Sequence, residues 1–184
     1  RMRAIIEALL LLSRADEGRL IAQWSRVDLA AVVGDVCDDA RILAEEKGVT
    51  FSMDLPEVEV VVHGDEGLLR MAIHNLVSNA LRYGNDNGRI RVEVHVNGMK
   101  VSLRVGNTGT PIPERSREVI FERFSRLDEA RQRHSGGLGL GLNLARDIAR
   151  GHGGDVVLVS SGSIETVFEM TIDVRMQSAS VFAE

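Results

Sequence analysis

The chain has 184 residues, 44% of them hydrophobic, and its 22 Lys and Arg residues against 27 Asp and Glu residues give a net charge of −5. This length fits one domain with an appended element, and the hydrophobic content can fill a core, which excludes a disordered chain. The negative charge argues against nucleic acid as a partner, and the single cysteine excludes a disulfide framework or a cysteine-cluster metal site. No uncharged apolar run approaches the roughly 18 residues of a membrane span, and no signal-peptide pattern is found, so we expect a domain of a reducing compartment.

The first predicted element is a helix that ends near Gly18, a residue type that often stops helices. Its apolar residues recur at steps of three and four, as in a coiled-coil seam: Met2, Ile5, Leu9 and Leu12, widened by Ile6 and Leu10. Two interpretations are open. The helix either docks on its own domain or forms half of a helical hairpin, and the heptad-type spacing favours the hairpin. Because the helical pattern already runs at the first residue, we expect the chain to be a piece of a longer protein.

Two further helices are predicted from their capping residues. Asp28 caps a helix that ends at Gly48 and presents one apolar face, made of Leu29, Val32, Val33, Val36, Ala40 and Leu43. Asp65 caps a helix that runs to about Tyr83 and is followed by a turn. Between them, residues 49–53 and 58–63 predict strands, and the β-branched residues of the second indicate burial on both sides.

The second half of the chain predicts mainly antiparallel strands. The expected elements are strands over 89–96 and 99–105, a short helix over 118–124, a helix over 140–150 that ends at Gly151, strands over 155–160 and 166–174, and a loose tail over 177–184. The dipeptide Asn97-Gly98 is the strongest short hairpin signal. Because the hairpins are segregated from the helices, we expect an α+β fold, a two-layer α/β sandwich in which three helices cover one face of a mixed sheet.

The third predicted helix carries two asparagines beside its buried stripe. Asn75 and Asn79 are one turn apart, about 40° from each other by helical geometry. Two stacked amides on a half-buried edge can offer carbonyl oxygens to Mg²⁺ when phosphates supply the remaining ligands. The alternative is that both side chains only hydrogen-bond neighbouring loops, as buried amides often do.

Two glycine-containing segments follow. In the first, Gly109 lets the backbone approach a flat ligand and Asn107 can read a base edge, although an isolated Asn-x-Gly is equally typical of an ordinary turn. In the second, residues 136–142 place four glycines at the start of the last helix, where exposed N–H groups and the helix dipole favour an anion. Leu144 stands where a dinucleotide-binding motif needs its third glycine, and no Lys follows as in a P-loop, so we favour a different anion site.

An arginine-rich loop precedes the second glycine segment. Its arginines are Arg115, Arg117, Arg123, Arg126, Arg131 and Arg133. Guanidinium groups suit phosphate oxygens, but the loop can also be a solvated surface neutralised by Glu114, Glu118, Glu122, Asp128 and Glu129. The five histidines lack metal-ligand spacing, and Cys37 beside an apolar stripe is expected to be inert core.

Taken in order, these segments resemble the ATP-binding catalytic domain of sensor histidine kinases, in the GHKL ATPase superfamily with its Bergerat fold. The resemblance covers residues 26–176 and rests on four boxes: an asparagine box at 74–83, a first glycine box at 107–112, a phenylalanine box at 120–124 continuing to Arg131, and a second glycine box at 137–142. Residues 1–20 resemble the second helix of the dimerisation hairpin, and 177–184 lie outside as a loose tail. The amino-acid sequence of these boxes is most similar to that of heavy-metal-responsive sensor kinases.

The resemblance implies a set of ligand contacts. Asn79 and Asn75 would hold Mg²⁺ against the phosphates of ATP, and Arg82 would act beside them. The residues implied in cofactor binding are Asn75, Asn79, Arg82, Tyr83, Asn107, Gly109, Ile112, Arg126, Arg131, Gly137, Leu138, Gly139, Leu140, Gly141, Leu142 and Thr166. Arg126 and Arg131 would contact phosphate oxygens, and Tyr83 and Ile112 would line the adenine pocket.

The resemblance also implies a function. The domain would transfer the γ-phosphate of Mg-ATP to a histidine on the dimerisation hairpin, for relay to a response regulator receiver domain, within a homodimeric sensor kinase anchored in the inner membrane. No phosphoacceptor box is present in the sequence, so the acceptor must lie outside it. Asn107 departs from the family, where Asp is usual, and leaves open a nucleotide-binding regulatory module. Other GHKL ATPases or serine-directed kinases also remain open, although Asn75 argues against the gyrase type, which prefers Glu there.

Overall fold

A computed structural model describes residues 2–17, 20, 23–125 and 138–174, with the side chains of residues 2–5 and 7–9 excepted. Its main layer is a five-stranded mixed sheet in the order β2-β4-β5-β7-β6. The strands are β2 (Thr50–Asp54), β4 (Arg89–Asn97), β5 (Lys100–Asn107), β6 (Asp155–Ser161) and β7 (Thr166–Asp173). The pair β2–β4 is parallel, and the other pairs are antiparallel.

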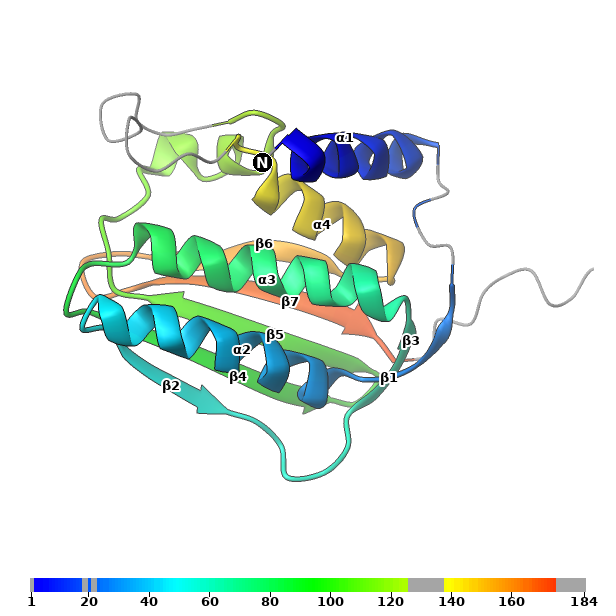
Figure 1. Cartoon of the computed structure of the whole chain (residues 1–184), viewed down its shortest axis with the longest axis horizontal. Coiled ribbons are helices and arrows are strands. Elements are labelled where there is room, and N and C mark those ends of the chain that lie inside the picture. Colours follow the sequence, from blue (N-terminus) through cyan, green and yellow to red (C-terminus); the bar gives the residue numbers. More distant parts are fainter. Residues whose placement is uncertain (1, 18–19, 21–22, 126–137, 175–184) are drawn as a thin grey trace, which may run out of the picture.

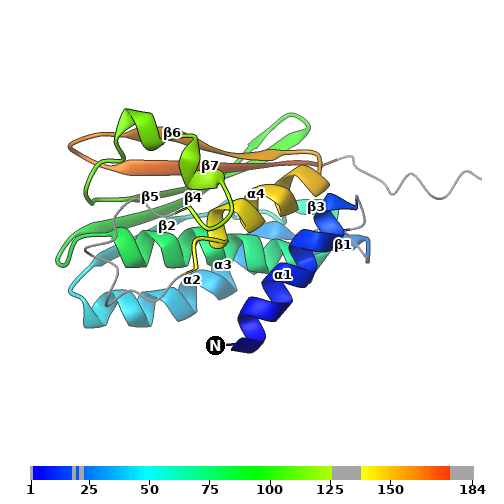
Figure 2. The ribbon, with the colours of Figure 1, turned by 90° about the horizontal axis from the view of Figure 1, so that it is seen from above.

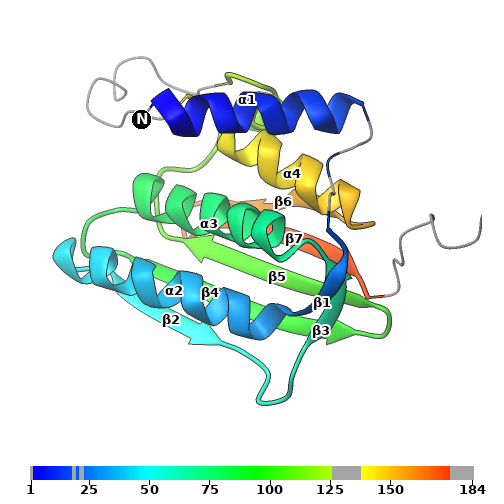
Figure 3. The ribbon, with the colours of Figure 1, turned by 45° about the vertical axis from the view of Figure 1, so that its right-hand side comes forward.

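Three helices cover one face of this sheet, as Figures 1 and 3 show: α2 (Leu29–Glu46), α3 (Glu66–Tyr83) and α4 (Gly141–Gly151). Inward residues of the strands, such as Val92 and Leu103, are fully buried beneath Leu69 and Ile73 of α3 and Ile148 of α4. Alternate strand residues such as Arg89 and Arg104 are exposed on the other face. The predicted two-layer α+β sandwich is therefore confirmed.

The capping predictions are confirmed, and they explain where the helices begin. Asp28 accepts hydrogen bonds from the N–H groups of Ala30 and Ala31, at 3.1 and 3.4 Å, and Asp65 accepts one from Leu68 at 3.2 Å. A tight turn joins β4 and β5 as predicted, but it lies one residue later than expected, because Asn97 pairs with Lys100 and leaves Gly98, with a φ of +62°, and Met99 as the two turn residues. The expected short helix over 118–124 is present only as one 3₁₀ turn, η2 (Val119–Phe121), and a second 3₁₀ turn, η1 (Glu114–Ser116), precedes the predicted range.

Two predictions about burial are wrong. Strand β3 (Val61–Gly64) starts later than expected, leaves Val58 71% exposed, and pairs with an unpredicted strand β1 (Ser25–Asp28) outside the main sheet. Leu43 is 53% exposed, and its neighbour Ala44 is buried instead. In both cases the sequence pattern indicated an apolar face but could not say how far the neighbouring layer extends over it.

Helix α1 (Met2–Asp16) packs against α4, and Figure 2 shows that it lies beside α4 near its C-terminal end and diverges from α4 toward its N-terminal end. Leu12 is buried, whereas Ile6 and Leu10 are 56% and 58% exposed. The side chains of Met2, Ile5 and Leu9, and Gly18, lie outside the described residues. Among the residues that the structure describes, no helix is long and apolar enough to cross a membrane.

Candidate functional site

Helix α3 places its two asparagines at the edge that faces α4. The helix buries Leu69, Ile73 and Leu76 against the sheet, which leaves Asn75 and Asn79 half-buried beside them. The Oδ1 atom of Asn75 lies 3.2 Å from the position that a Cβ atom on Gly141 would occupy. Within the described part of the chain, neither amide has a hydrogen-bond partner. The Asn75 amide therefore faces the beginning of α4, and Asn79 lies one helical turn further along the same helix edge.

The beginning of α4 lacks a side-chain cap. Its N-cap residue, Leu140, makes no capping hydrogen bond, and the first turn contains no acidic residue. The first N–H groups of a helix have no partner within the helix, so they are free to bind an anion. Gly139 has a φ of +72°, and a Cβ atom there would lie 2.5 Å from the Ser125 carbonyl oxygen, so only glycine fits. This geometry supports the predicted anion site.

The first glycine box closes against the C-terminal end of α3. Asn107, the last residue of β5, is 4% exposed and stands in register with Thr166 of β7. A Cβ atom on Gly109 would lie 2.5 Å from the Tyr83 carbonyl oxygen and 2.9 Å from Nδ2 of Asn107, so this glycine permits a close backbone approach. Gly84 and Gly109 form a β-bridge, which fixes the loop against the helix. The asparagine and glycine boxes are thus brought together.

A serine that sequence reasoning missed links two predicted residues. The backbone N–H of Ile112 donates to Ser161 Oγ at 2.8 Å, and Ser161 Oγ lies 2.8 Å from Thr166 Oγ1. Ser161 is the last residue of β6 and pairs with Thr166 across the β6–β7 turn. The only sequence feature that could have indicated this link is that Ser161 and Thr166, both with hydroxyl side chains, flank the turn between the last two predicted strands.

The remaining predicted residues are distributed as follows. Arg82 and Tyr83 are exposed at the end of α3, Leu138 is 42% exposed, Leu140 is buried, and Leu142 is partly buried against the core. Arg126, Arg131 and Gly137 lie outside the described residues. Acidic residues of the loop were one possible set of partners for its arginines, but Arg123 pairs with Asp16 and Asp147, which lie outside the loop.

His152 is fully buried, immediately after α4. Its Nε2 atom accepts a hydrogen bond from the Asp65 N–H at 3.0 Å, which leaves Nδ1 to donate to the Ile148 carbonyl oxygen at 2.7 Å. Its ring lies 5.5 Å from that of Trp24. Burial lowers the pKa of His152, against the opposing effects of Ile148 and Asp65. The residue therefore closes the end of α4 as a neutral imidazole, with both ring nitrogens hydrogen-bonded.

Among the residues that the structure describes, no three His, Cys, Asp or Glu side chains lie together as metal ligands. Cys37 is fully buried, and burial raises the pKa of its thiol to about 11, as expected for an inert core residue.

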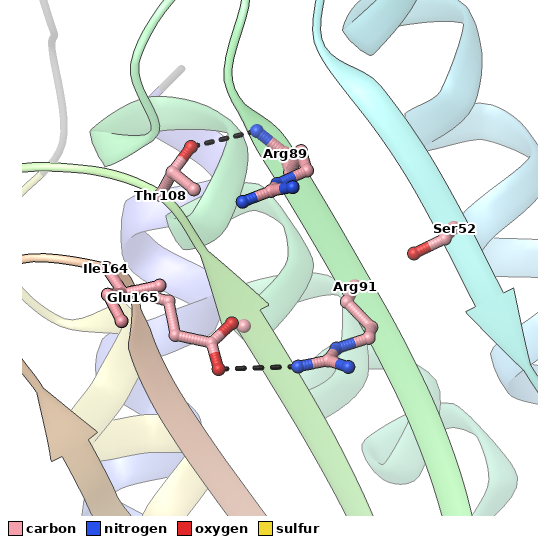
Figure 4. Close-up of a pocket in the computed structure, with 7 residues that line it drawn as sticks. Ser52, Arg89, Arg91, Thr108, Ile164 and Glu165 are labelled. Carbon is pink, nitrogen blue, oxygen red and sulfur yellow. Dashed lines mark hydrogen bonds and ion pairs between the residues drawn. The ribbon is translucent and has the colours of Figure 1, made fainter.

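A pocket of about 330 Å³ lies on the sheet face that the helices leave open (Figure 4). It is lined by Ser52, Arg89, Arg91, Gly106, Thr108, Ile164 and Glu165. Arg91 points across it to Glu165, with a distance of 3.3 Å between Nη2 and Oε1. None of the predicted site residues lines this pocket, so it is separate from the α3–α4 edge.

Comparisons with known proteins point to one family of ATPases. Residues 64–176 match the family of histidine kinase-, DNA gyrase B- and HSP90-like ATPases. The chain is 38% identical over 160 residues to the sensor histidine kinase CusS of Escherichia coli O6:H1, which covers 87% of this chain and 33% of CusS. It is 32% identical over 172 residues to the sensor-like histidine kinase SenX3 of Mycolicibacterium smegmatis, which covers 94% of this chain and 44% of SenX3. The chain thus spans less than half the length of these relatives.

The solved structures give the same result. The catalytic domain of histidine kinase ThkA superposes with a TM-score of 0.74 at 25% identity, over 83% of this chain and 97% of ThkA. The family match covers more than half of the chain, and it includes the two asparagines, both glycine segments and His152. The chain therefore belongs to the histidine kinase-, DNA gyrase B- and HSP90-like ATPases, as a catalytic domain of the histidine kinase type.

Proposed function

We propose that the chain binds Mg-ATP between α3 and the beginning of α4, and passes the γ-phosphate to a histidine on a dimerisation hairpin. The observation that carries this proposal is the juxtaposition of Asn75 with Gly141 at the uncapped start of α4. A helix start rich in glycine binds anionic oxygens, and amide oxygens one helical turn apart suit Mg²⁺. Because the two features face each other, they fit one ligand that carries both a metal ion and phosphate groups.

The residues divide into two groups around this ligand. On the base side, Asn107 would face the adenine amino group, with Gly109, Ile112, Thr166 and Tyr83 lining the pocket. On the phosphate side, the N–H groups of 137–142 would cradle the phosphates, and Arg126 and Arg131 would add charge. Asn79 and Asn75 would hold Mg²⁺, and Arg82 would neutralise phosphate charge. The hydrogen bonds from Ile112 through Ser161 to Thr166 support the base side, because they fix the pocket wall before ligand binds.

The chain's own contribution to transfer is positional. Bound Mg-ATP supplies the phosphoryl group and the metal charge that offsets its negative oxygens. The protein orients this group toward an incoming imidazole and provides fixed N–H dipoles, which need no reorganisation during reaction. In the described ranges the exposed His74 lies one residue before Asn75, but on a helix position that points away from the buried stripe. We therefore expect the acceptor histidine to come from the hairpin.

The larger assembly follows from the same reasoning. We infer that residues 1–20 are the C-terminal part of the hairpin, that 26–176 form the catalytic domain, and that 177–184 are a tail. The whole protein would be a homodimeric sensor kinase of the inner membrane, with this domain in the cytoplasm and a response regulator receiver domain as its partner. The amino-acid sequence of the boxes and the 38% identity with CusS support the proposal that the protein is a heavy-metal-responsive kinase.

The decisive experiment mixes this chain with γ-labelled ATP, Mg²⁺ and a separately supplied phosphoacceptor hairpin. Acid-labile label should appear on the hairpin, not on the chain, and Asn79→Ala should abolish the transfer. His74→Ala is the matched control on the same helix, because this exposed residue lies outside the proposed site. Acid-labile label on the chain alone would contradict the proposal that the acceptor lies on the hairpin. His134, which lies outside the described residues, is the position to test in that case.

A further inference from the structure

The guanidinium of Arg123 joins two segments that are far apart in the sequence. Arg123 follows η2, and its Nη1 and Nη2 atoms donate to the two carboxylate oxygens of Asp16, at 2.8 and 2.5 Å. Asp16 is the last residue of α1. The same guanidinium lies 3.9 Å from Asp147, in the middle of α4. One side chain therefore contacts the end of the first helix and the flank of the nucleotide-site helix.

The ion pair between Arg123 and Asp16 depends on orientation. Each of two guanidinium nitrogens donates to a different carboxylate oxygen, and two parallel hydrogen bonds fix an angle as well as a distance. The hydrogen bond from Arg123 holds the pKa of Asp16 below its usual range, and burial raises the pKa of Asp147. The side chains of Arg123 and Asp16 are 36% and 59% exposed. An ion pair this exposed adds little to folding stability, so its effect lies in orientation.

The described residues of this segment also make apolar and aromatic contacts. Leu12 and Leu20 are 2% and 6% exposed, and the Trp24 ring lies beside His152. Apolar contacts hold the segment on the domain but do not define an angle, because hydrophobic burial is non-directional. At the other end of α1, Ile6 and Leu10 are exposed. A helix of 15 residues is about 22 Å long, so a small rotation near Asp16 moves its far end by many ångströms.

The segment that carries Arg123 is also attached to the glycine-rich start of α4. The backbone N–H of Phe124 donates to the Gly139 carbonyl oxygen at 3.0 Å, and Nδ2 of Asn143 donates to the Phe121 carbonyl oxygen at 3.0 Å. The residues on both sides of Arg123 are thus bound to the element that would cradle the phosphates. An orientation set at Asp16 is an orientation relative to this site.

We infer that Arg123 is a positioning residue: by binding Asp16 it fixes the angle between helix α1 and the nucleotide site. The consequence of this inference is that the angle decides where the hairpin presents its phosphoacceptor to the γ-phosphate. This consequence rests on the proposed function. The structural part, that the pair sets the angle, stands on the contacts alone. The two parts can therefore be tested separately.

The structural part is tested by a distance measurement without nucleotide. Spin labels on Ile6→Cys and Asp39→Cys report the angle between α1 and the domain, because both positions are exposed and lie on α1 and α2. The buried Cys37, with its raised thiol pKa, should react slowly with the labels. We expect one narrow distance distribution that broadens in Asp16→Asn and in Arg123→Gln. Because the two residues act through each other, the double variant should be no broader than either single variant.

Arg115→Gln is the matched control, because Arg115 is an exposed arginine of the same loop with no ion pair among the described residues. It should leave the distribution narrow. An unchanged distribution in both single variants would overturn the inference. So would broadening in Arg123→Gln without broadening in Asp16→Asn, since the angle would then not depend on the pair.

The functional part is tested with both hairpin helices present. Asp16→Asn and Arg123→Gln should each lower the rate of phosphoryl transfer several-fold and leave the Kd for ATP unchanged. A loss of ATP affinity as large as the loss of rate would assign Arg123 to the binding site and contradict a positioning role. If the unaltered protein transfers no phosphate, the proposed function fails, and the distance distributions still decide whether Arg123 sets the angle.

Discussion

The two ends of helix α4 are built in opposite ways. At its beginning, the first N–H groups have no side-chain cap, and the facing amide of Asn75 has no partner in the described part of the chain. At its end, His152 is fully buried, and both of its ring nitrogens are hydrogen-bonded. Polar groups that are satisfied within the protein stabilise the fold, whereas polar groups left available near a surface can bind a ligand. The two ends should therefore respond differently to substitution.

The largest effect is expected for His152→Ala. This change removes a fully buried ring and leaves the Asp65 N–H without its acceptor, so the free energy of unfolding should fall by about 3 kcal/mol. Urea unfolding provides the measurement. His74→Ala, at an exposed histidine on α3, should change it by less than about 0.5 kcal/mol. Equal effects of the two substitutions would mean that the buried hydrogen bonds of His152 do not stabilise the domain.

The free energy of unfolding should also depend on pH through His152, at the C-terminal end of α4. Burial lowers the pKa of folded His152, while the unfolded residue titrates near 6.5. The stabilisation is thus complete above about pH 6.5, and it is lost as the pH falls from there toward the lower folded pKa. Unfolding followed by the fluorescence of Trp24, the single tryptophan, between pH 7.5 and 5.5 should show this loss. His152→Gln should remove the dependence, and an equal slope in that variant would assign it to other groups.

The substitution Asn79→Ala on α3, in the proposed site at the beginning of α4, should weaken ATP binding and leave the free energy of unfolding nearly unchanged. Loss of an amide oxygen that holds Mg²⁺ should weaken Mg-ATP binding at least ten-fold, or about 1.4 kcal/mol, with little change in unfolding. Without Mg²⁺ the variant and the original chain should bind ATP alike. Calorimetry with and without Mg²⁺ gives both values. Equal weakening in the two conditions would point to a direct contact with the nucleotide in place of a metal contact.

The substitution Gly141→Ala should lower the affinity for ATP but change the free energy of unfolding little. Alanine favours the helix by roughly 0.5–1 kcal/mol over glycine. Its Cβ atom would lie 3.2 Å from Asn75 Oδ1, a tight contact that takes back part of this gain and fills the space between the amide and the helix start. We expect unfolding free energy to change by less than about 1 kcal/mol and ATP affinity to fall several-fold, as urea unfolding and calorimetry would measure. An unchanged affinity would place the nucleotide elsewhere.

The sequence by itself determined the features that depend on neighbouring residues. The caps at Asp28 and Asp65, the presence of a tight turn that includes Gly98 and the shared helix edge of Asn75 and Asn79 each depend on residues within one or two turns. Their physical cause is local, because a capping carboxylate or a helical repeat acts over a few residues. The glycines of the second box likewise indicated a helix start that can bind an anion.

The tertiary structure decided the features that depend on which distant segments meet. No local pattern pairs Asp16 with Arg123, which are 107 residues apart, or links Ser161 to Ile112. The separate β1–β3 ribbon, the exposure of Leu43 and the complete burial of His152 likewise depend on where the neighbouring layer ends. A charged, hydroxyl or imidazole group has many possible partners in the sequence. Only the packing of the helices on the sheet brings one of them within hydrogen-bonding distance.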